Sequence, residues 1–146
     1  MGNRINKPML AVAVGGFNGG QVDFLVYLSQ HAIGEPYTLK LLEFQYADHL
    51  LEAAHRHPFD LFIVLLNPTL AYSPACDEKG HEGDFGVLSH LKEAYRKPLI
   101  VLHNGYAGYS ADAIKRAGAD AVFGMPFDTH LFLSTLRDCL RIETKR

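Results

Sequence analysis

Short apolar runs alternate along the chain with longer stretches in which apolar residues recur at helical spacing. The runs that predict strands are residues 9–14, 37–42, 60–66, 98–103 and 121–124. The stretches that predict helices are residues 20–31, 47–56, 84–95, 110–117 and 128–142. Such alternation is typical of βα units around a parallel sheet. The pattern therefore predicts a doubly wound α/β fold with a five-stranded parallel sheet and helices on both faces.

The last of these helices has the clearest signals. Asp128 follows Pro126 and is a good N-cap residue. Leu133, Leu136 and Leu140 recur at i, i+3 and i+7, which places them in one apolar stripe. We expect this stripe to cover one face of the sheet.

The size and charge of the chain narrow the functional classes. Its 146 residues, 48% of them hydrophobic, suit one core, so we expect a single domain over residues 1–146. The 14 basic and 16 acidic residues form no block of like charge. Nucleic acid and anionic membranes are therefore not expected partners.

The N-terminal segment and the cysteines point to the cytoplasm. The apolar run MLAVAV, residues 9–14, is too short for the core of a signal peptide or for a membrane span. Cys76 and Cys139 are the only cysteines, and this count fits reduced thiols better than a disulfide framework. We expect a cytoplasmic protein without a native disulfide.

In a doubly wound sheet, ligands gather at the carboxyl ends of the strands. The residues at these ends are Gly15 and Gly16 after the first strand, Leu65 to Asn67 after the third, His103 and Asn104 after the fourth, and Met125 after the fifth. The chemistry of the protein depends on these positions.

Residues 97–128, KPLIVLHNGYAGYSADAIKRAGADAVFGMPFD, resemble the second half of a receiver domain of a bacterial response regulator. His103 takes the place of the family's hydroxyl residue, Ala117–Asp120 matches A-G-A-D, and Met125–Phe127 replaces K-P-F. The segments HPFDLFIVLLN and MLAVAVGG resemble its third and first strands. The resemblance implies a flavodoxin-like sheet with strand order 2-1-3-4-5 and a cis peptide before Pro126.

A receiver binds Mg²⁺ through three carboxylates, phosphorylates one of them, and uses a lysine and a hydroxyl to sense the phosphoryl group. This sequence lacks these groups. Glycine, leucine or asparagine, and methionine cannot hold the metal or form a phosphoaspartate. Val122 also replaces the frequent switch aromatic. The resemblance therefore implies a degenerate pocket with no catalytic residue, in which the family's positions are held by Gly15 (paired with Gly16, or with Val14 if the register slips by one), Leu65 or Asn67, His103 and Met125.

The glycine-rich turn after the first strand leaves a second reading open. Gly15, Gly16, Gly19 and Gly20 leave backbone N–H groups free near a helix start, where anions bind well. Glu43, near the end of the second strand, could bind a ribose. The dinucleotide fingerprint is nevertheless broken at Phe17. A permissive turn and a solvated glutamate are the alternative.

The segment between residues 67 and 86 is an insertion relative to a receiver. It contains the potential metal ligands Cys76, Asp77, Glu78, His81, Glu82 and Asp84. Their spacing does not match a closed zinc site, so we expect no metal and interpret the segment as a lid or docking loop. His103 is either a pH-sensitive group or a hydrogen-bonded histidine at a strand end.

These observations favour a non-catalytic, phosphorylation-independent signalling module. The resemblance implies that it binds a protein partner, or a second copy of itself, through the fourth and fifth predicted helices and the fifth strand. We expect no cofactor. The alternative is a domain that binds a nucleotide or another small molecule at the glycine-rich turn.

Overall fold

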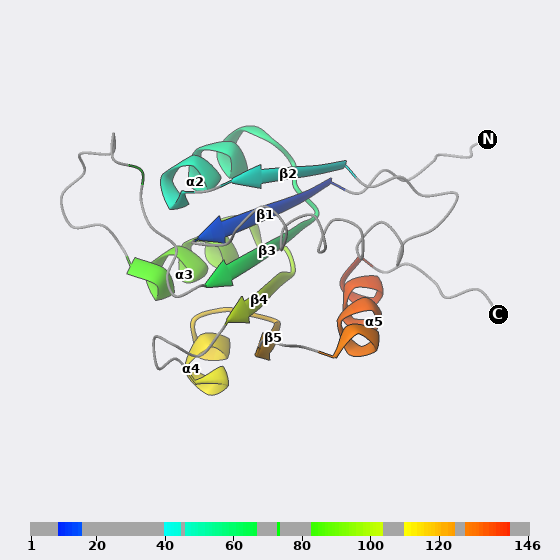
Figure 1. Cartoon of the computed structure of the whole chain (residues 1–146). Helices are drawn as coiled ribbons and strands as arrows, with labels where there is room; N and C mark the ends of the chain where they lie inside the picture. The colour runs from blue at the N-terminus through cyan, green and yellow to red at the C-terminus, as the bar shows by residue number, and fades with distance from the viewer. Residues whose placement is uncertain are drawn as a thin grey trace, which may run out of the picture.

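The computed structural model describes residues 9–15, 40–44, 46–66, 73, 83–103, 110–124 and 128–140. Within these ranges the chain alternates strands and helices (Figure 1). The strands are β1 (Met9–Gly15), β2 (Lys40–Phe44), β3 (Leu61–Leu66), β4 (Leu99–His103) and β5 (Ala121–Gly124). The helices are α2 (Ala47–Arg56), α3 (Gly83–Tyr95), α4 (Ala111–Arg116) and α5 (Thr129–Leu140). The helix expected at 20–31 lies outside the described residues.

The five described strands form one parallel sheet in the order β2-β1-β3-β4-β5. The expected α/β class is therefore confirmed, and the order is the one that the receiver resemblance implies. β3 is central, and all six of its residues are buried. Its sequence, LFIVLL, is apolar without interruption, because helices cover both faces of a central parallel strand.

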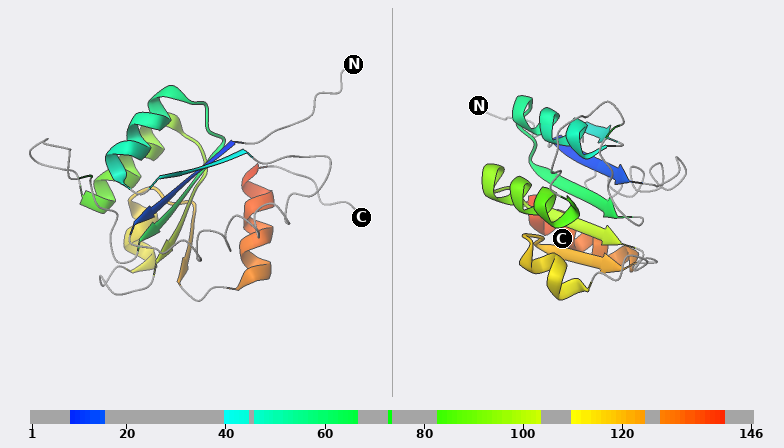
Figure 2. Two further views of the ribbon diagram at one scale, coloured as in Figure 1. Left: turned by 45° about the horizontal axis from the view of Figure 1, so that its top comes forward. Right: turned by 90° about the vertical axis from the view of Figure 1, so that its left-hand side faces the viewer.

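The helices divide between the two faces of the sheet. Figure 2 shows α2, α3 and α4 on one face and α5 on the other. Alternate residues of β3 follow this division, since side chains point to opposite faces along a strand. Phe62, Val64 and Leu66 belong to the core cluster that includes α2, α3 and α4. The residues between them are buried as well, so the sheet carries a core on each side.

Most element boundaries agree with the sequence analysis within one or two residues, and those of α2 and β5 agree fully. β2 differs most: it ends at Phe44 rather than at residue 42, and residues 37–39, where it was expected to begin, lie outside the described residues. Leu42 and Phe44 both pack against the core, and the polar Glu43 lies between them. This period-two pattern is that of a half-buried strand, and it carries the pairing with β1 on to Phe44.

The start of α5 is as expected, but its buried stripe differs. The Asp128 carboxylate accepts a hydrogen bond from the Leu131 backbone N–H at 3.1 Å, which is an N-cap contact. The fully buried residues are Phe132 and Leu136, whereas Leu133 is half-buried. Phe132 rather than Leu133 is fully buried, because its ring packs edge-on against Phe123 of β5, with ring centroids 5.8 Å apart.

Candidate functional site: the carboxyl edge of the sheet

One row of residues ends four neighbouring strands. The register pairs Gly15 with Leu66, Leu66 with His103, and His103 with Gly124. These residues lie at the carboxyl ends of β1, β3, β4 and β5, where receiver chemistry would take place. We call them the edge row. It contains one imidazole and neither a carboxylate nor an amine.

The register shows which residue of β3 lies level with His103. It is Leu66, which stands between the two predicted phosphoacceptor positions, Leu65 and Asn67. Leu65 is one residue earlier and pairs with Leu102, so its side chain points to the opposite face of the sheet. Both leucines are buried, at 1% and 2% exposure. Leu65 and Leu66 are therefore core residues.

His103 is the polar member of the edge row. Its side chain is half-buried, and its Nδ1 atom is buried with no hydrogen-bond partner among the described residues. A Cβ atom placed on Gly124 would lie 3.8 Å from His103 Nε2, so the imidazole lies close beside the Gly124 backbone. An isolated imidazole can bind a proton or contribute one ligand to a site. It cannot supply the oxygen shell that Mg²⁺ requires.

Several residues predicted for the site lie outside the described part of the chain. They are Gly16, Gly19, Gly20, Asn67 and Met125, together with Cys76, Asp77, Glu78, His81 and Glu82 of the insertion. The anion site, the lid and the cis peptide before Pro126 therefore stay predictions. Asp84 and Glu43 lie in α3 and β2, and Glu43 pairs with Val12 one residue before the strand ends. Among the described residues no group of three or more His, Cys, Asp or Glu could hold a metal.

The structure shows one polar contact that sequence reasoning missed. Ser73, in the insertion, donates two hydrogen bonds to Asp48 in the first turn of α2: its backbone N–H to Oδ1 at 2.7 Å and its hydroxyl to Oδ2 at 2.6 Å. Ser73 is only 6% exposed. His49 Nε2 lies 3.8 Å from the same Oδ2. The hydroxyl donates to the carboxylate, so this group does not resemble a Ser-His-Asp triad, in which histidine activates serine.

The pKa of Asp48 reflects this contact. Burial of the carboxyl opposes its ionisation, but the hydrogen bonds from the Ser73 hydroxyl and backbone N–H outweigh that effect. They hold the pKa of Asp48 below its ordinary value, with a further small contribution from His49. The sequence offered only a weak signal for this pairing, because an acid in a first turn and a distant serine are common.

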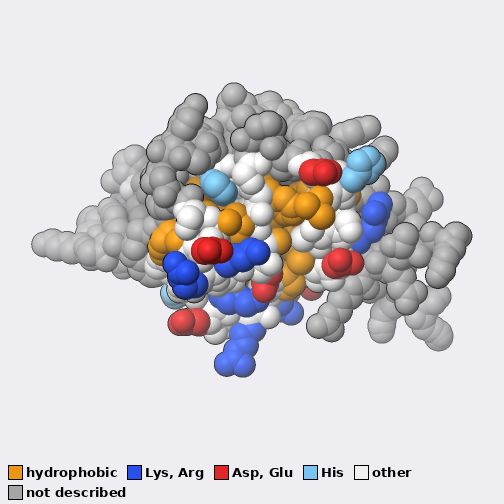
Figure 3. Space-filling model, turned by 90° about the horizontal axis from the view of Figure 1, so that it is seen from below, with side chains coloured by type: hydrophobic (Ala, Val, Ile, Leu, Met, Phe, Trp, Pro, Cys, Tyr) orange, Lys and Arg blue, Asp and Glu red, His pale blue; other side chains and the backbone are white. Residues whose placement is uncertain are grey.

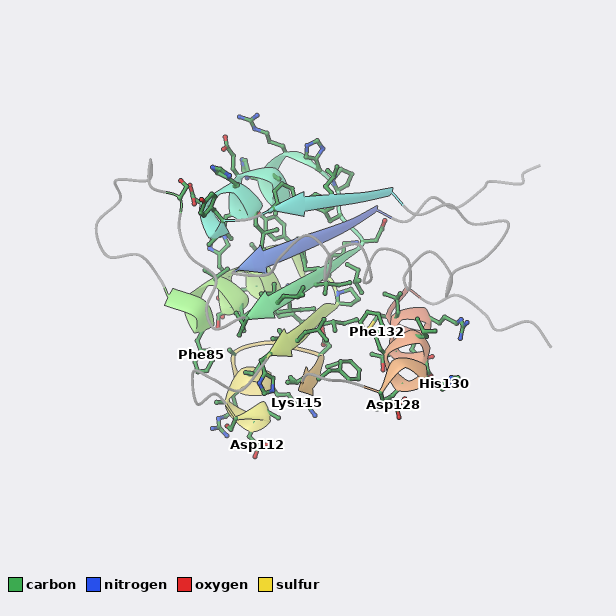
Figure 4. The ribbon with its side chains drawn as sticks, viewed as in Figure 1. Phe85, Asp112, Lys115, Asp128, His130 and Phe132 are labelled. Carbon is green, nitrogen blue, oxygen red and sulfur yellow. The ribbon has the colours of Figure 1, made fainter. Side chains whose placement is uncertain are left out.

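At the β5 edge of the sheet, α4, β5 and α5 form a mixed surface. Figure 3 looks onto this side and shows apolar side chains among basic and acidic ones. Figure 4 labels Asp112 and Lys115 on α4, Asp128 directly before α5 and His130 on α5. Leu131 is 55% exposed, and it is the exposed large hydrophobic residue among those described. We call Asp112, Lys115, Val122, Asp128, His130 and Leu131 the α4–β5–α5 surface.

The segment Ala117–Asp120, which carries the family resemblance, has a structural role at the amino ends of the strands. Gly118 has φ +128°, and Ala119 is 7% exposed. Asp120 Oδ2 accepts hydrogen bonds from Lys92 Nζ at 2.8 Å and from the Leu99 backbone N–H at 2.9 Å. The carboxylate therefore joins the end of α3 to the start of β4. Ala117–Asp120 positions elements and takes no part in the edge row.

Comparisons with known proteins identify the fold. No protein-family model matches the chain, and no curated protein matches it at a significant level. Solved receiver domains do match. The signal receiver domain of an HD domain-containing protein from Pseudomonas fluorescens Pf-5 is 18% identical, with a TM-score of 0.65 over 93% of this chain and 96% of that one.

Two further receivers show the same likeness. The chemotaxis response regulator CheY4 of Vibrio cholerae is 16% identical, with a TM-score of 0.61 over 92% of this chain and all (100%) of that one. The receiver domain of a sensor histidine kinase from Pseudomonas aeruginosa PAO1 is 13% identical, with a TM-score of 0.63 over 92% of this chain and 98% of that one; its structure holds magnesium in the active-site cleft. The chain therefore has the fold of response-regulator receiver domains.

In the part of the chain that the structure describes, no helix is both long enough and apolar enough to cross a membrane.

Proposed function

We propose that this protein is a receiver-like signalling module that acts by binding a protein partner, independently of phosphorylation. The observation that carries the proposal is the composition of the edge row, Gly15–Leu66–His103–Gly124. A phosphorylated receiver needs carboxylates to bind Mg²⁺ and to accept the phosphoryl group. The edge row offers backbone, a buried leucine and one imidazole in their place.

The residues that directly follow these four strands in sequence support the same conclusion. Residues 16–21, 67–72, 104–109 and 125–127, which follow β1, β3, β4 and β5, contain no Asp, Glu, Lys or Arg. The residues directly after these four strands therefore offer no substitute for the missing acids or lysine, and the charged residues of the β3–α3 connection begin only at Asp77. We infer that the domain has no catalytic residue and no cofactor of its own, and that it acts in the cytoplasm.

The α4–β5–α5 surface is the proposed site of partner binding. It combines an exposed leucine, Leu131, with charged groups of both signs on α4 and α5. A large apolar side chain surrounded by polar ones is the usual arrangement of a protein interface, in which a few anchors contribute most of the affinity. The partner is another signalling protein or a second copy of this chain.

Treatment with a small phosphodonor and Mg²⁺, followed by intact mass measurement, tests the phosphorylation part of the proposal. We expect no change in mass, while a phosphorylatable receiver in the same tube gains one phosphoryl group. An acid-labile phosphoryl group on this protein would contradict the proposal. Peptide mapping would then identify the acceptor residue.

Comparative pull-down from the native cell tests the binding part. Leu131→Asp places one negative charge on the proposed surface, and Glu52→Lys makes a larger charge change, of two units, at an exposed position of α2. We expect the wild type and Glu52→Lys to retain a protein that Leu131→Asp loses. Equal retention by all three proteins would place the binding site elsewhere.

A further inference from the structure

Helices α3 and α4 lie on the same face of the sheet (Figure 2), and an open groove runs between them. The Ser89 hydroxyl donates a hydrogen bond to the Ala117 carbonyl at 2.8 Å, which ties the two helices together. We call the hollow beside this bond the α3–α4 groove. Its volume is about 430 Å³, which is within the range of ligand-binding clefts. Its lining among the described residues consists of Phe85, Gly86 and Ser89 of α3 and Ala113, Arg116 and Ala117 of α4.

Phe85 is the large apolar side chain of this lining. Figure 4 shows it extending from α3 on the side of α4. Phe85 also packs against the buried core, so its ring is held in place and gives the groove a firm apolar wall. Gly86 and Ala113 fill little of the space next to it. The groove therefore suits a second large apolar side chain, which would cover the ring of Phe85.

Arg116 gives the groove its charge. Its side chain is exposed, and among the described residues no ion pair or side-chain hydrogen bond engages its guanidinium group. The described lining contains no Asp or Glu. A guanidinium group binds a carboxylate through two parallel hydrogen bonds. The groove is therefore complementary to a carboxylate that lies close to an apolar group.

We propose that the α3–α4 groove docks an acidic segment of a partner protein. In that segment a large apolar side chain fills the hollow beside Phe85, and a carboxylate pairs with Arg116. Burial of the apolar side chain supplies affinity, and the charge pair supplies orientation and selectivity. Nucleic acid fits the groove less well, because its phosphate backbone is bound by several cations and the described lining contains one.

The α3–α4 groove is separate from the α4–β5–α5 surface. That surface takes Asp112 and Lys115 from α4, and neither residue lines the groove. Ala113, Arg116 and Ala117 follow each other at helical spacing and so share another side of α4. The docking site does not depend on the proposed function, and the two proposals fail separately.

Selection of random peptides displayed on phage, with the full chain as target, tests the groove. We expect enriched peptides in which Asp or Glu accompanies a large apolar residue. Fluorescence anisotropy then compares their affinity for the wild type and two variants. Arg116→Glu should weaken binding by about tenfold or more, because repulsion replaces attraction. Lys115→Glu is the matched control, since it makes the same charge change at the adjacent exposed position outside the groove and should bind nearly as the wild type does.

Ala113→Phe tests the apolar half of the site, because the added ring fills the hollow from within. It should weaken the same peptides by about tenfold or more, and urea denaturation checks that the variant stays folded. A further readout needs no variant: an enriched peptide should shift the amide resonances of Gly86, Ser89 and Ala117 in the wild type.

Three results would overturn the proposal. The first is an equal loss of affinity in Arg116→Glu and Lys115→Glu, since overall charge would then explain the binding. The second is a selection that yields no acidic peptide. The third is binding of random single-stranded DNA, abolished by Arg116→Glu, in place of the peptides.

Discussion

At the residue scale, Gly118 shows why the Ala117–Asp120 motif is present in a chain that lacks the phosphorylation residues of a receiver. Its φ of +128° lies in a region that residues with a Cβ rarely adopt. A Cβ there would come within 2.9 Å of Lys92 Cβ and 3.3 Å of Lys92 Cγ. The glycine is required by the turn between α4 and β5, and it allows α3 to approach closely. This requirement is independent of phosphorylation.

Gly118→Ala should therefore destabilise the protein. Backbone strain alone costs about 1–3 kcal/mol, and the contact with Lys92 adds to it. Urea denaturation followed by circular dichroism measures the loss. Gly124→Ala is the matched control, because a Cβ there meets only His103 atoms at 3.8 and 3.9 Å, an ordinary contact distance. Equal stability of Gly118→Ala and the wild type would refute this interpretation of the turn.

Cys139 offers a second test at this scale. Burial raises the pKa of its thiol, and the carboxylates of Asp120 and Asp138 raise it further, although Lys92 acts in the opposite direction. Since the thiolate is the reactive form, Cys139 in a Cys76→Ser variant should react with iodoacetamide more slowly than glutathione does at mildly alkaline pH. Asp138→Asn should quicken the reaction. A rate profile that levels off at lower pH than that of glutathione would contradict the raised pKa.

Individual residues were predictable where the backbone fixes their position. Gly15 and His103 lie at strand ends, as the apolar runs before them indicate. The residue of β3 that lies level with His103 was not predictable, because register depends on neighbouring strands, and the pairing brings Leu66 rather than Leu65 to that level. The Asp48–Ser73 contact was also hidden, since it joins residues far apart in sequence.

At the scale of elements, pattern reasoning succeeded wherever one face or both faces of an element are buried. β3 and β4 read as continuous apolar runs, and α2 as an amphipathic helix, because their neighbours impose those patterns. It was less accurate for β2 and for the stripe of α5. In both cases an aromatic residue, Phe44 or Phe132, makes the decisive packing contact. A leucine-based periodicity does not register such a contact.

Phe132 is therefore the residue of α5 whose loss we expect to matter most. It is fully buried, at 0% exposure, and its ring meets Phe123 edge-on at 73°. Phe132→Ala should lower the free energy of unfolding by about 3–5 kcal/mol. Leu131→Ala, one position earlier and 55% exposed, should change it by less than about 0.5 kcal/mol. Chemical denaturation of both variants checks the difference, and similar losses would mean that α5 packs in another orientation.

At the scale of the whole molecule, the two ends of the sheet have different roles. Toward the amino ends of the strands, Asp120 and Lys92 join α3 to β4 with charged hydrogen bonds. At the carboxyl ends, the edge row is apolar apart from His103. The sequence resembles a receiver most closely at Ala117–Asp120, which stabilises the fold. It departs from a receiver in the edge row, where the phosphorylation chemistry would take place. A binding role for the helical surfaces is consistent with this distribution.

The remaining alternative is a nucleotide or phosphate ligand at residues 15–20. It predicts that such a ligand raises the melting temperature of the protein, whereas the signalling module predicts no change. Anion binding at a turn draws on backbone N–H groups and is commonly reinforced by a cationic side chain. Residues 15–22 contain no Lys or Arg, and the neighbouring edge row contributes only His103. We therefore expect nucleoside mono-, di- and triphosphates to leave the melting temperature unchanged, even at millimolar concentration. A ligand at a hundred times its Kd would stabilise the folded protein by about 2.7 kcal/mol, which a thermal-shift assay detects readily. A rise with one nucleotide that disappears in Gly16→Asp would favour the small-molecule receptor over the signalling module.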